Sequence, residues 1–194
     1  MQTIWARRAL VMNSWAEAVK VDIHEDGRIG AVVVGADCPP EAVRVETLLP
    51  APANLHSHAF QRAMAGLTER RGDDPQDSFW TWRQLMYRFL DRLTPDDIQA
   101  IAAFVQMEML EAGYATNVEF HYLHHGPDGR PYDDLAEMAG RIAAAAAQTG
   151  IGLTLLPVLY SYGGLDRRAL VTGQVRFGND PDRFARLVEA ARGH

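Results

Sequence analysis

The chain has 194 residues, of which 47% are hydrophobic, and its 19 Lys and Arg against 25 Asp and Glu give a net charge of −6. This length allows one substantial core and a small second unit. Without a Lys/Arg cluster or about eighteen consecutive apolar residues, neither a nucleic-acid surface nor a membrane span is expected. Cys38 is the single cysteine, which excludes an internal disulfide and Cys-rich zinc sites and fits a cytoplasmic setting.

The first fifty residues have the alternation of short strands. Residues 18–23 alternate apolar and polar side chains, and Asp26 and Gly27 are residues typical of a turn. Residues 29–34 are expected to form the strand that follows this turn. Another alternating stretch covers residues 43–48. We therefore expect a β-sandwich-like segment over residues 1–50 and a domain boundary close to residue 50.

From residue 51 onward the pattern changes to strands separated by long helices. A buried apolar strand that ends at His56-Ser57-His58 is expected, and further strands at 116–121 and 153–159. Helices are expected at 78–93, 94–113, 134–148 and 181–192, with Ser78, Thr94 and Asp180 as N-caps and Gly150 as a stop. This alternation predicts an α/β fold with parallel strands, either an open sheet or part of a (β/α) barrel.

Polar residues at the ends of these strands favour the barrel. His56 and His58 end the first strand, His121 the second, and Tyr160 follows the third. Barrel enzymes place their chemistry at the carboxyl ends of the strands, whereas no Gly-rich phosphate loop of an open nucleotide-binding sheet is present. Residues 51–194 are therefore predicted to form a partial (β/α) barrel domain.

His56-Ser57-His58 is the central motif. Residues two apart on a strand project from one face, so both imidazoles can bind one metal ion, zinc or iron. The alternative is a pair of half-buried polar residues satisfied by the neighbouring backbone. We favour the metal, because nothing else explains two imidazoles at a strand end.

Other candidates have equally ordinary alternatives. His121, His124 and His125 leave a strand for a Gly/Pro loop, so substrate contact or loop hydrogen bonding is expected ahead of a second metal site. Arg83 beside two tryptophans can hold an anion or lie solvated on its helix. Gln61 can face the strand ends or the surface.

Four segments carry a family resemblance. Residues 56–62 (HSHAFQR), 78–83 (SFWTWR), 119–125 (EFHYLHH) and 155–162 (LLPVLYSY) are similar to the corresponding segments of formimidoylglutamate deiminases, in the amidohydrolase superfamily. The H-x-H pair marks only the superfamily. The second and third segments point to the deiminases.

The resemblance implies a function and a site. Members hydrolyse the formimidoyl group of N-formimidoyl-L-glutamate to N-formyl-L-glutamate and ammonia, in histidine degradation, with one divalent metal, zinc or iron, at the mouth of a (β/α)8 barrel. It implies that His56 and His58 are metal ligands and that Gln61, Arg83 and Tyr122 bind the small-molecule substrate. Arg83 suits this role because guanidinium pairs with carboxylate in bidentate geometry.

The number of strands departs from the family. Its remaining ligands, a His and an Asp, and a catalytic His come from later strands, so no catalytic residue is assigned here and the chain is expected to be an N-terminal portion of a longer enzyme. A second copy or another partner would then cover its open sheet edges. Two alternatives stay open: an aminohydrolase acting on a heterocyclic amine, and a noncatalytic fragment that needs a complementing partner.

Overall fold

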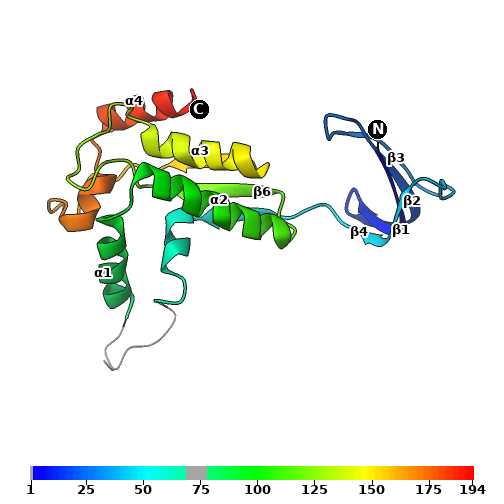
Figure 1. Ribbon diagram of the computed structural model, residues 1–194, viewed down its shortest axis with the longest axis horizontal. Coiled ribbons are helices and arrows are strands. Elements are labelled where there is room, and N and C mark those ends of the chain that lie inside the picture. Colours follow the sequence, from blue (N-terminus) through cyan, green and yellow to red (C-terminus); the bar gives the residue numbers. More distant parts are fainter. Residues whose placement is uncertain (1, 69–77) are drawn as a thin grey trace. The chain divides into compact units, whose positions relative to one another are not determined.

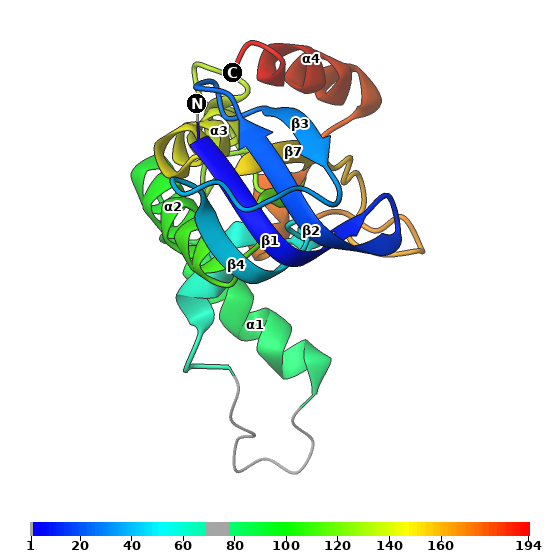
Figure 2. The ribbon, with the colours of Figure 1, turned by 90° about the vertical axis from the view of Figure 1, so that its right-hand side faces the viewer.

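The computed structural model describes residues 2–68 and 78–194 and divides the chain into two compact units, Met1–Ala51 and Pro52–His194 (Figure 1). The first unit is one four-stranded sheet of order β3-β2-β1-β4, whose strands can be followed in Figure 2. Its strands are β1 (Gln2–Val11), β2 (Ser14–Ile23), β3 (Ile29–Val33) and β4 (Val43–Leu48). Successive strands β1, β2 and β3 pair antiparallel, and β4 pairs parallel to β1.

The first hairpin of this sheet closes through a tight loop. Met12 and Asn13 both have positive φ, 47° and 67°, as a two-residue loop between twisted strands requires. Ala6, Ala9, Val19 and Val21 form the buried cluster of the unit. The small side chains of this cluster limit the apolar area that the unit removes from water.

The second unit is a three-stranded parallel sheet with order β5-β6-β7, joined by helical crossovers. Its strands are β5 (Ala53–Ser57), β6 (Thr116–His121) and β7 (Gly152–Pro157), and its α-helices are α1 (Phe79–Leu90), α2 (Pro95–Glu111), α3 (Glu137–Thr149) and α4 (Pro181–Ala191). Two 3₁₀ helices, η1 (Ala59–Met64) and η2 (Thr172–Phe177), complete it. The predicted βαβαβ order is confirmed.

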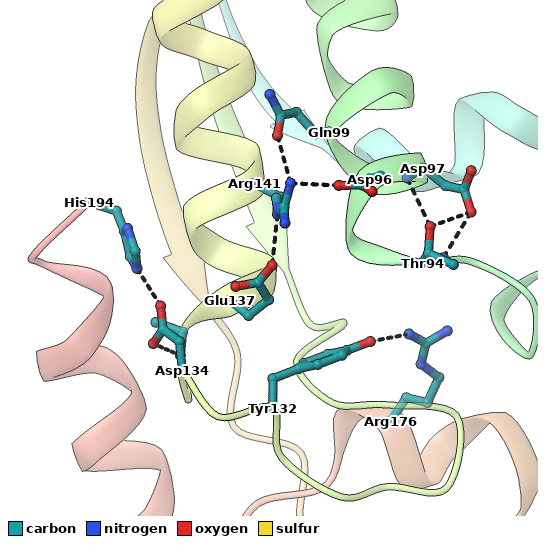
Figure 3. A network of polar contacts seen from close by, with 11 residues as sticks. Thr94, Asp96, Asp97, Gln99, Tyr132, Asp134, Glu137, Arg141, Arg176 and His194 are labelled. Atoms are coloured by element: carbon teal, nitrogen blue, oxygen red, sulfur yellow. Dashed lines mark hydrogen bonds and ion pairs between the residues drawn. The ribbon is translucent and has the colours of Figure 1, made fainter.

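Helices α2 and α3 lie side by side on one face of this sheet (Figure 1). Thr94 caps α2 in a reciprocal box with Asp97, and Pro95 opens the first turn. Arg141 of α3 joins the two helices, because its guanidinium bonds Glu137 of its own helix and Asp96 of α2 (Figure 3). Gly150 ends α3 with φ of +80°, as predicted.

Strand β5 differs from the expectation of a buried strand. Leu55 is 74% exposed and His56 is exposed as well, whereas the next strand buries Asn117, Glu119 and His121. The reason is topological, because β5 is an edge strand and β6 lies in the centre of the sheet. Over the described residues, no helix is long and apolar enough to cross a membrane.

Candidate active site

A pocket of about 460 Å³ opens where β5, β6 and β7 end and α1 begins. It is lined by His58, Gln61, Phe79, Trp82, Arg83, Met86, Phe120, Tyr122, Val158, Tyr160 and Phe177. Four of the five predicted site residues are in this set. Larger hollows exist elsewhere, including one of about 710 Å³ between α2 and α3, but they contain none of the predicted residues. The chemistry of the side chains, and not the size of the hollow, selects this pocket.

The fifth predicted residue, His56, lies directly beside it. The Nε2 atoms of His56 and His58 are 2.9 Å apart, so both imidazoles converge on one point. Phe120 fixes this arrangement, since its ring stacks on His56 at 5.6 Å and meets His58 edge-on at 5.3 Å. His56 belongs to β5, whereas His58 is the residue just beyond the strand, at the start of η1.

The convergent nitrogen atoms fit two ligands of one metal ion. Two imidazole ligands of a tetrahedral zinc ion are roughly 3.4 Å apart, so the observed pair needs to open by only a few tenths of an ångström. His58 Nδ1 lies 3.0 Å from the carbonyl oxygen of Phe120, which can only accept a hydrogen bond. The proton is therefore on Nδ1, and Nε2 keeps its lone pair for a metal.

Two imidazoles do not complete a metal site by themselves. Among residues 2–68 and 78–194, no three His, Cys, Asp or Glu side chains lie close enough together to hold one ion. The pair therefore supplies two nitrogen ligands, and the coordination of a zinc ion would need further ligands.

Gln61 and Tyr122 form a connected pair on the pocket wall. Gln61 Nε2 donates a hydrogen bond to the Tyr122 hydroxyl over 2.9 Å, although the residues are 61 positions apart in the sequence. The Tyr122 ring packs edge-on against His58 and against Phe177. Burial raises the pKa of Tyr122 to about 12, so its hydroxyl stays a neutral hydrogen-bonding group.

Arg83 is a cation whose described neighbours are neutral. Its Nε donates to the Tyr87 hydroxyl over 2.5 Å and its Nη2 to the Tyr160 hydroxyl over 3.0 Å. Its guanidinium also lies 5.8 Å from the centre of the Trp80 ring. No acidic side chain of the described residues forms an ion pair with it. A half-buried guanidinium at a pocket, held by phenols, is suited to an anionic ligand.

The second histidine group forms structural contacts outside the pocket. His124 Nε2 donates to the carbonyl of Val158 over 3.1 Å, and His125 Nε2 lies 3.1 Å from the carbonyl of Gly178. Burial lowers the pKa of His124 to about 4 and lowers that of His121 and His125 as well, so all three favour the neutral form. For His124 and His125 the geometry therefore agrees with loop hydrogen bonding, one of the two roles expected from the sequence, whereas the buried His121 Nε2 has no hydrogen-bond partner among the described residues.

Four polar residues around the site were not among the predicted site residues. They are Tyr87, Glu119, Tyr160 and Gln174. Glu119 Oε1 accepts a hydrogen bond from the backbone N–H of Ala59 over 2.6 Å, which fixes the turn that follows His58. Burial raises the pKa of Glu119. A glutamate within a predicted strand was the sequence feature from which a role for Glu119 could have been predicted.

Comparisons with known proteins bear on this arrangement. No protein-family model matches the chain. The formimidoylglutamate deiminase of Pseudomonas aeruginosa PAO1 is 48% identical over 192 residues, which are 99% of this chain and 42% of that protein. The crystal structure of an amidohydrolase from Brucella melitensis matches with a TM-score of 0.92 and 49% identity, over 100% of this chain and 43% of that one.

The chain resembles formimidoylglutamate deiminase. The resemblance predicted from the four segments is thereby confirmed, and so is the fold class of a small β unit followed by β/α units of an amidohydrolase-type barrel. The chain spans about two fifths of the length of these relatives, as expected for an N-terminal portion. Atrazine chlorohydrolase from Arthrobacter aurescens, solved with zinc and atraton, is only 20% identical, with a TM-score of 0.68 over 96% of this chain and 41% of that one, and shows the shared fold alone.

Proposed function

We propose that the chain is part of a metal-dependent deiminase that hydrolyses N-formimidoyl-L-glutamate to N-formyl-L-glutamate and ammonia, as a cytoplasmic step of histidine degradation. The observation that carries the proposal is the pocket that is lined both by His58 and by Arg83, a guanidinium without an ion-pair partner among the described residues. An amidine at one end and carboxylates at the other are the features that such a pocket distinguishes. The similarity to the deiminase of P. aeruginosa supports this choice.

His56 and His58 are proposed as two ligands of one divalent metal, zinc or iron. The fixed tautomer of His58 and the convergence of the two Nε2 atoms support that role. Such an ion, when bound, lowers the pKa of water so that hydrolysis proceeds near neutral pH. The phenyl ring of Phe120 holds both imidazoles in place and keeps one side of them away from water.

Gln61, Arg83 and Tyr122 are proposed to bind the substrate. Arg83 would pair with a carboxylate, whose two oxygen atoms match the guanidinium. The Gln61 amide donates to Tyr122 and keeps its carbonyl oxygen for another donor, such as an amidine N–H. Phe79, Trp82 and Phe177 complete the walls and exclude water from the aliphatic part of the ligand.

The experiment compares ligands that differ in one carboxylate. Purified chain is loaded with Zn²⁺ or Fe²⁺, bound metal is measured, and ammonia release is followed with N-formimidoyl-L-glutamate and with its decarboxylated analogue, N-formimidoyl-4-aminobutyrate. Calorimetry measures how tightly the same chain binds N-formyl-L-glutamate, the dicarboxylate product, and N-formyl-4-aminobutyrate, which lacks one carboxylate. We expect wild type to bind N-formyl-L-glutamate more tightly than N-formyl-4-aminobutyrate, and Arg83→Ala to remove that preference. Equal affinity of wild type for both ligands would contradict the proposal.

The aromatic walls favour one alternative strongly enough to test it alongside. Phe79, Trp82, Phe120 and Phe177 could stack on a flat ring, so a heterocyclic amine is the second candidate substrate. An aminohydrolase of that kind has no use for a carboxylate-binding arginine. Tighter binding of guanine or a triazine than of N-formyl-L-glutamate, unaffected by Arg83→Ala, would favour this alternative.

A further inference from the structure

The Tyr160 hydroxyl is a polar group of the pocket wall that the proposed function does not yet use. Tyr160 lies three residues beyond β7 and lines the same pocket as His58 and Arg83. Its oxygen atom is 3.0 Å from Arg83 Nη2 and 3.2 Å from Gln174 Nε2. The hydroxyl therefore belongs to two hydrogen bonds from residues on α1 and η2.

The direction of these two hydrogen bonds is fixed by chemistry. A guanidinium only donates. The Gln174 amide is oriented by the backbone N–H of Val171, which donates to Gln174 Oε1 over 3.1 Å, so the group that faces Tyr160 is the NH₂. Both lone pairs of the Tyr160 oxygen atom are thus used as acceptors. Its own O–H must donate elsewhere.

No described side chain or carbonyl accepts that proton. Among the described residues, the hydrogen bonds of the Tyr160 hydroxyl are the two from Arg83 and Gln174. A hydroxyl that donates to nothing in the protein, on the wall of a pocket, is available to a ligand. A ligand atom that accepts from it also lies beside the positive charge of Arg83.

The backbone around Tyr160 holds the ring in position. Asn179 N–H donates to the Tyr160 carbonyl over 2.9 Å, and the Ser161 hydroxyl donates to the Asn179 carbonyl over 2.9 Å. The ring itself packs edge-on against Phe177, with 5.5 Å between centroids. Such a donor is already oriented before a ligand arrives, which reduces the entropy lost on binding.

We propose that Tyr160 determines specificity by donating its O–H to the carboxylate group that also pairs with Arg83. One oxygen of the carboxylate faces the guanidinium and the other accepts from the phenol. The inference rests on the proposed function, because it needs a carboxylate ligand in this pocket. Gln174 acts as a positioning residue that holds the hydroxyl in the donating orientation.

The test measures binding of N-formyl-L-glutamate to the purified 194-residue chain by calorimetry, with Tyr160→Phe as the variant. A hydrogen bond to a charged group corresponds to an affinity loss of about tenfold to a hundredfold. Two analogues, N-formyl-4-aminobutyrate and N-formyl-L-2-aminobutyrate, each lack one carboxylate. We expect Tyr160→Phe to leave the affinity of one analogue unchanged, which identifies the carboxylate concerned. Tyr162→Phe, a more exposed neighbour outside this pocket, is the matched control.

A second variant separates donation to the ligand from support of Arg83. Fluorination makes a phenol a better donor and a poorer acceptor without removing the hydroxyl. With 3-fluorotyrosine at position 160, at a pH where the phenol stays protonated, we expect N-formyl-L-glutamate to bind more tightly than to wild type. Weaker binding would mean that Tyr160 serves only to hold Arg83 and would overturn the inference.

The remaining outcomes separate this inference from the proposed function. If Arg83→Ala loses the dicarboxylate preference and Tyr160→Phe binds as wild type does, the inference fails and the proposed function stands. An equal loss for all three ligands in Tyr160→Phe means a structural role and also overturns the inference. If wild type shows no preference for the dicarboxylate, both fail.

Discussion

One arginine lies near each end of helix α1, and the surroundings of the two guanidinium groups differ. Arg83, near the first turn, meets two phenols and a pocket. Arg176 of η2 lies at the other end, is 0% exposed, and donates to the carbonyl of Leu90, the last residue of α1, and to that of Leu93 in the turn that follows. Neither forms an ion pair with an acidic side chain of the described residues. The surroundings, and not the residue type, separate the arginine that holds the fold from the one available to a ligand.

The C-terminal end of α1 stabilises the buried positive charge of Arg176. The last carbonyls of a helix carry a partial negative charge, and a buried guanidinium satisfies several of them at once. It also donates to the carbonyl of His125 over 2.8 Å and to the Tyr132 hydroxyl (Figure 3). Burial lowers its pKa. This side chain therefore joins α1, η2 and the loop after β6.

Removal of the Arg176 guanidinium is expected to produce the largest effect. Arg176→Met leaves three buried carbonyls without a donor, so the free energy of unfolding should fall by about 4 kcal/mol. Urea unfolding measures this in a background with Trp5 and Trp15 replaced by Phe, where Trp80 and Trp82 report on the second unit. Arg186→Met, an exposed arginine of α4, is the control and should change stability by less than about 0.5 kcal/mol. A similar small change for Arg176→Met would remove the distinction between the two arginines.

Low pH is expected to destabilise the region around Arg176 by protonating His124, whose backbone N–H donates to the Arg176 carbonyl. Folded His124 has a pKa of about 4, below the ordinary 6.5, so the unfolded chain binds the extra proton between these values. Stability is thus complete above pH 6.5 and falls as the pH drops toward 4, by about 3 kcal/mol for this group. Unfolding measured from pH 7.5 to 4 should show a shallower fall for His124→Gln. The surface variant His24→Gln should keep the full slope.

A third arginine shows what an acidic partner contributes. Arg62 of η1 binds Glu108 of α2 with two hydrogen bonds of 2.6 and 2.7 Å, and both side chains are about one third exposed. We expect Arg62→Met to lower the free energy of unfolding by less than Arg176→Met does and by more than Arg83→Met does, since a bidentate pair exceeds an ordinary surface ion pair but is screened by water. The loss should shrink in 1 M NaCl. A loss that is independent of salt would assign the effect to packing of the side chain on Phe104.

The smallest stability change is expected at Arg83. Arg83→Met leaves two phenols that water can reach, so the free energy of unfolding should stay within about 1 kcal/mol of wild type. The same variant loses the binding preference for the dicarboxylate. A stability loss as large as that of Arg176→Met would show that the two arginines serve the same structural purpose.

Local features of the fold were predictable because they depend on adjacent residues. The cap at Thr94, the stop at Gly150 and the convergent pair His56 and His58 each follow from residues within a few positions of one another. The site's long-range contacts were not. Gln61 meets Tyr122 across 61 positions and Arg83 meets Tyr160 across 77, and periodicity carries no information on which side chains of distant segments meet.

The burial of single residues was also hidden in the sequence. Arg176 stands in a short 3₁₀ segment whose pattern gives no reason to bury a guanidinium, because the carbonyls of Leu90 and Leu93 that accept from it lie at the end of α1 and in the turn after it, more than eighty positions earlier. The exposure of Leu55 was missed for a related reason. An apolar strand gives the same pattern at the edge of a sheet as in its centre, and the position is decided by the pairing of distant segments.

Gly173 limits which residues related proteins can have around Tyr87 and Arg83. A Cβ at Gly173 would lie 2.6 Å from the Tyr87 ring, the same ring whose hydroxyl accepts from Arg83. Any larger residue there displaces Tyr87 and, through it, the guanidinium. Substitutions at positions 83 and 87 that change ligand preference should therefore occur together with substitutions at position 173. A relative that keeps arginine at 83 but lacks this glycine is expected to hold its ligand differently.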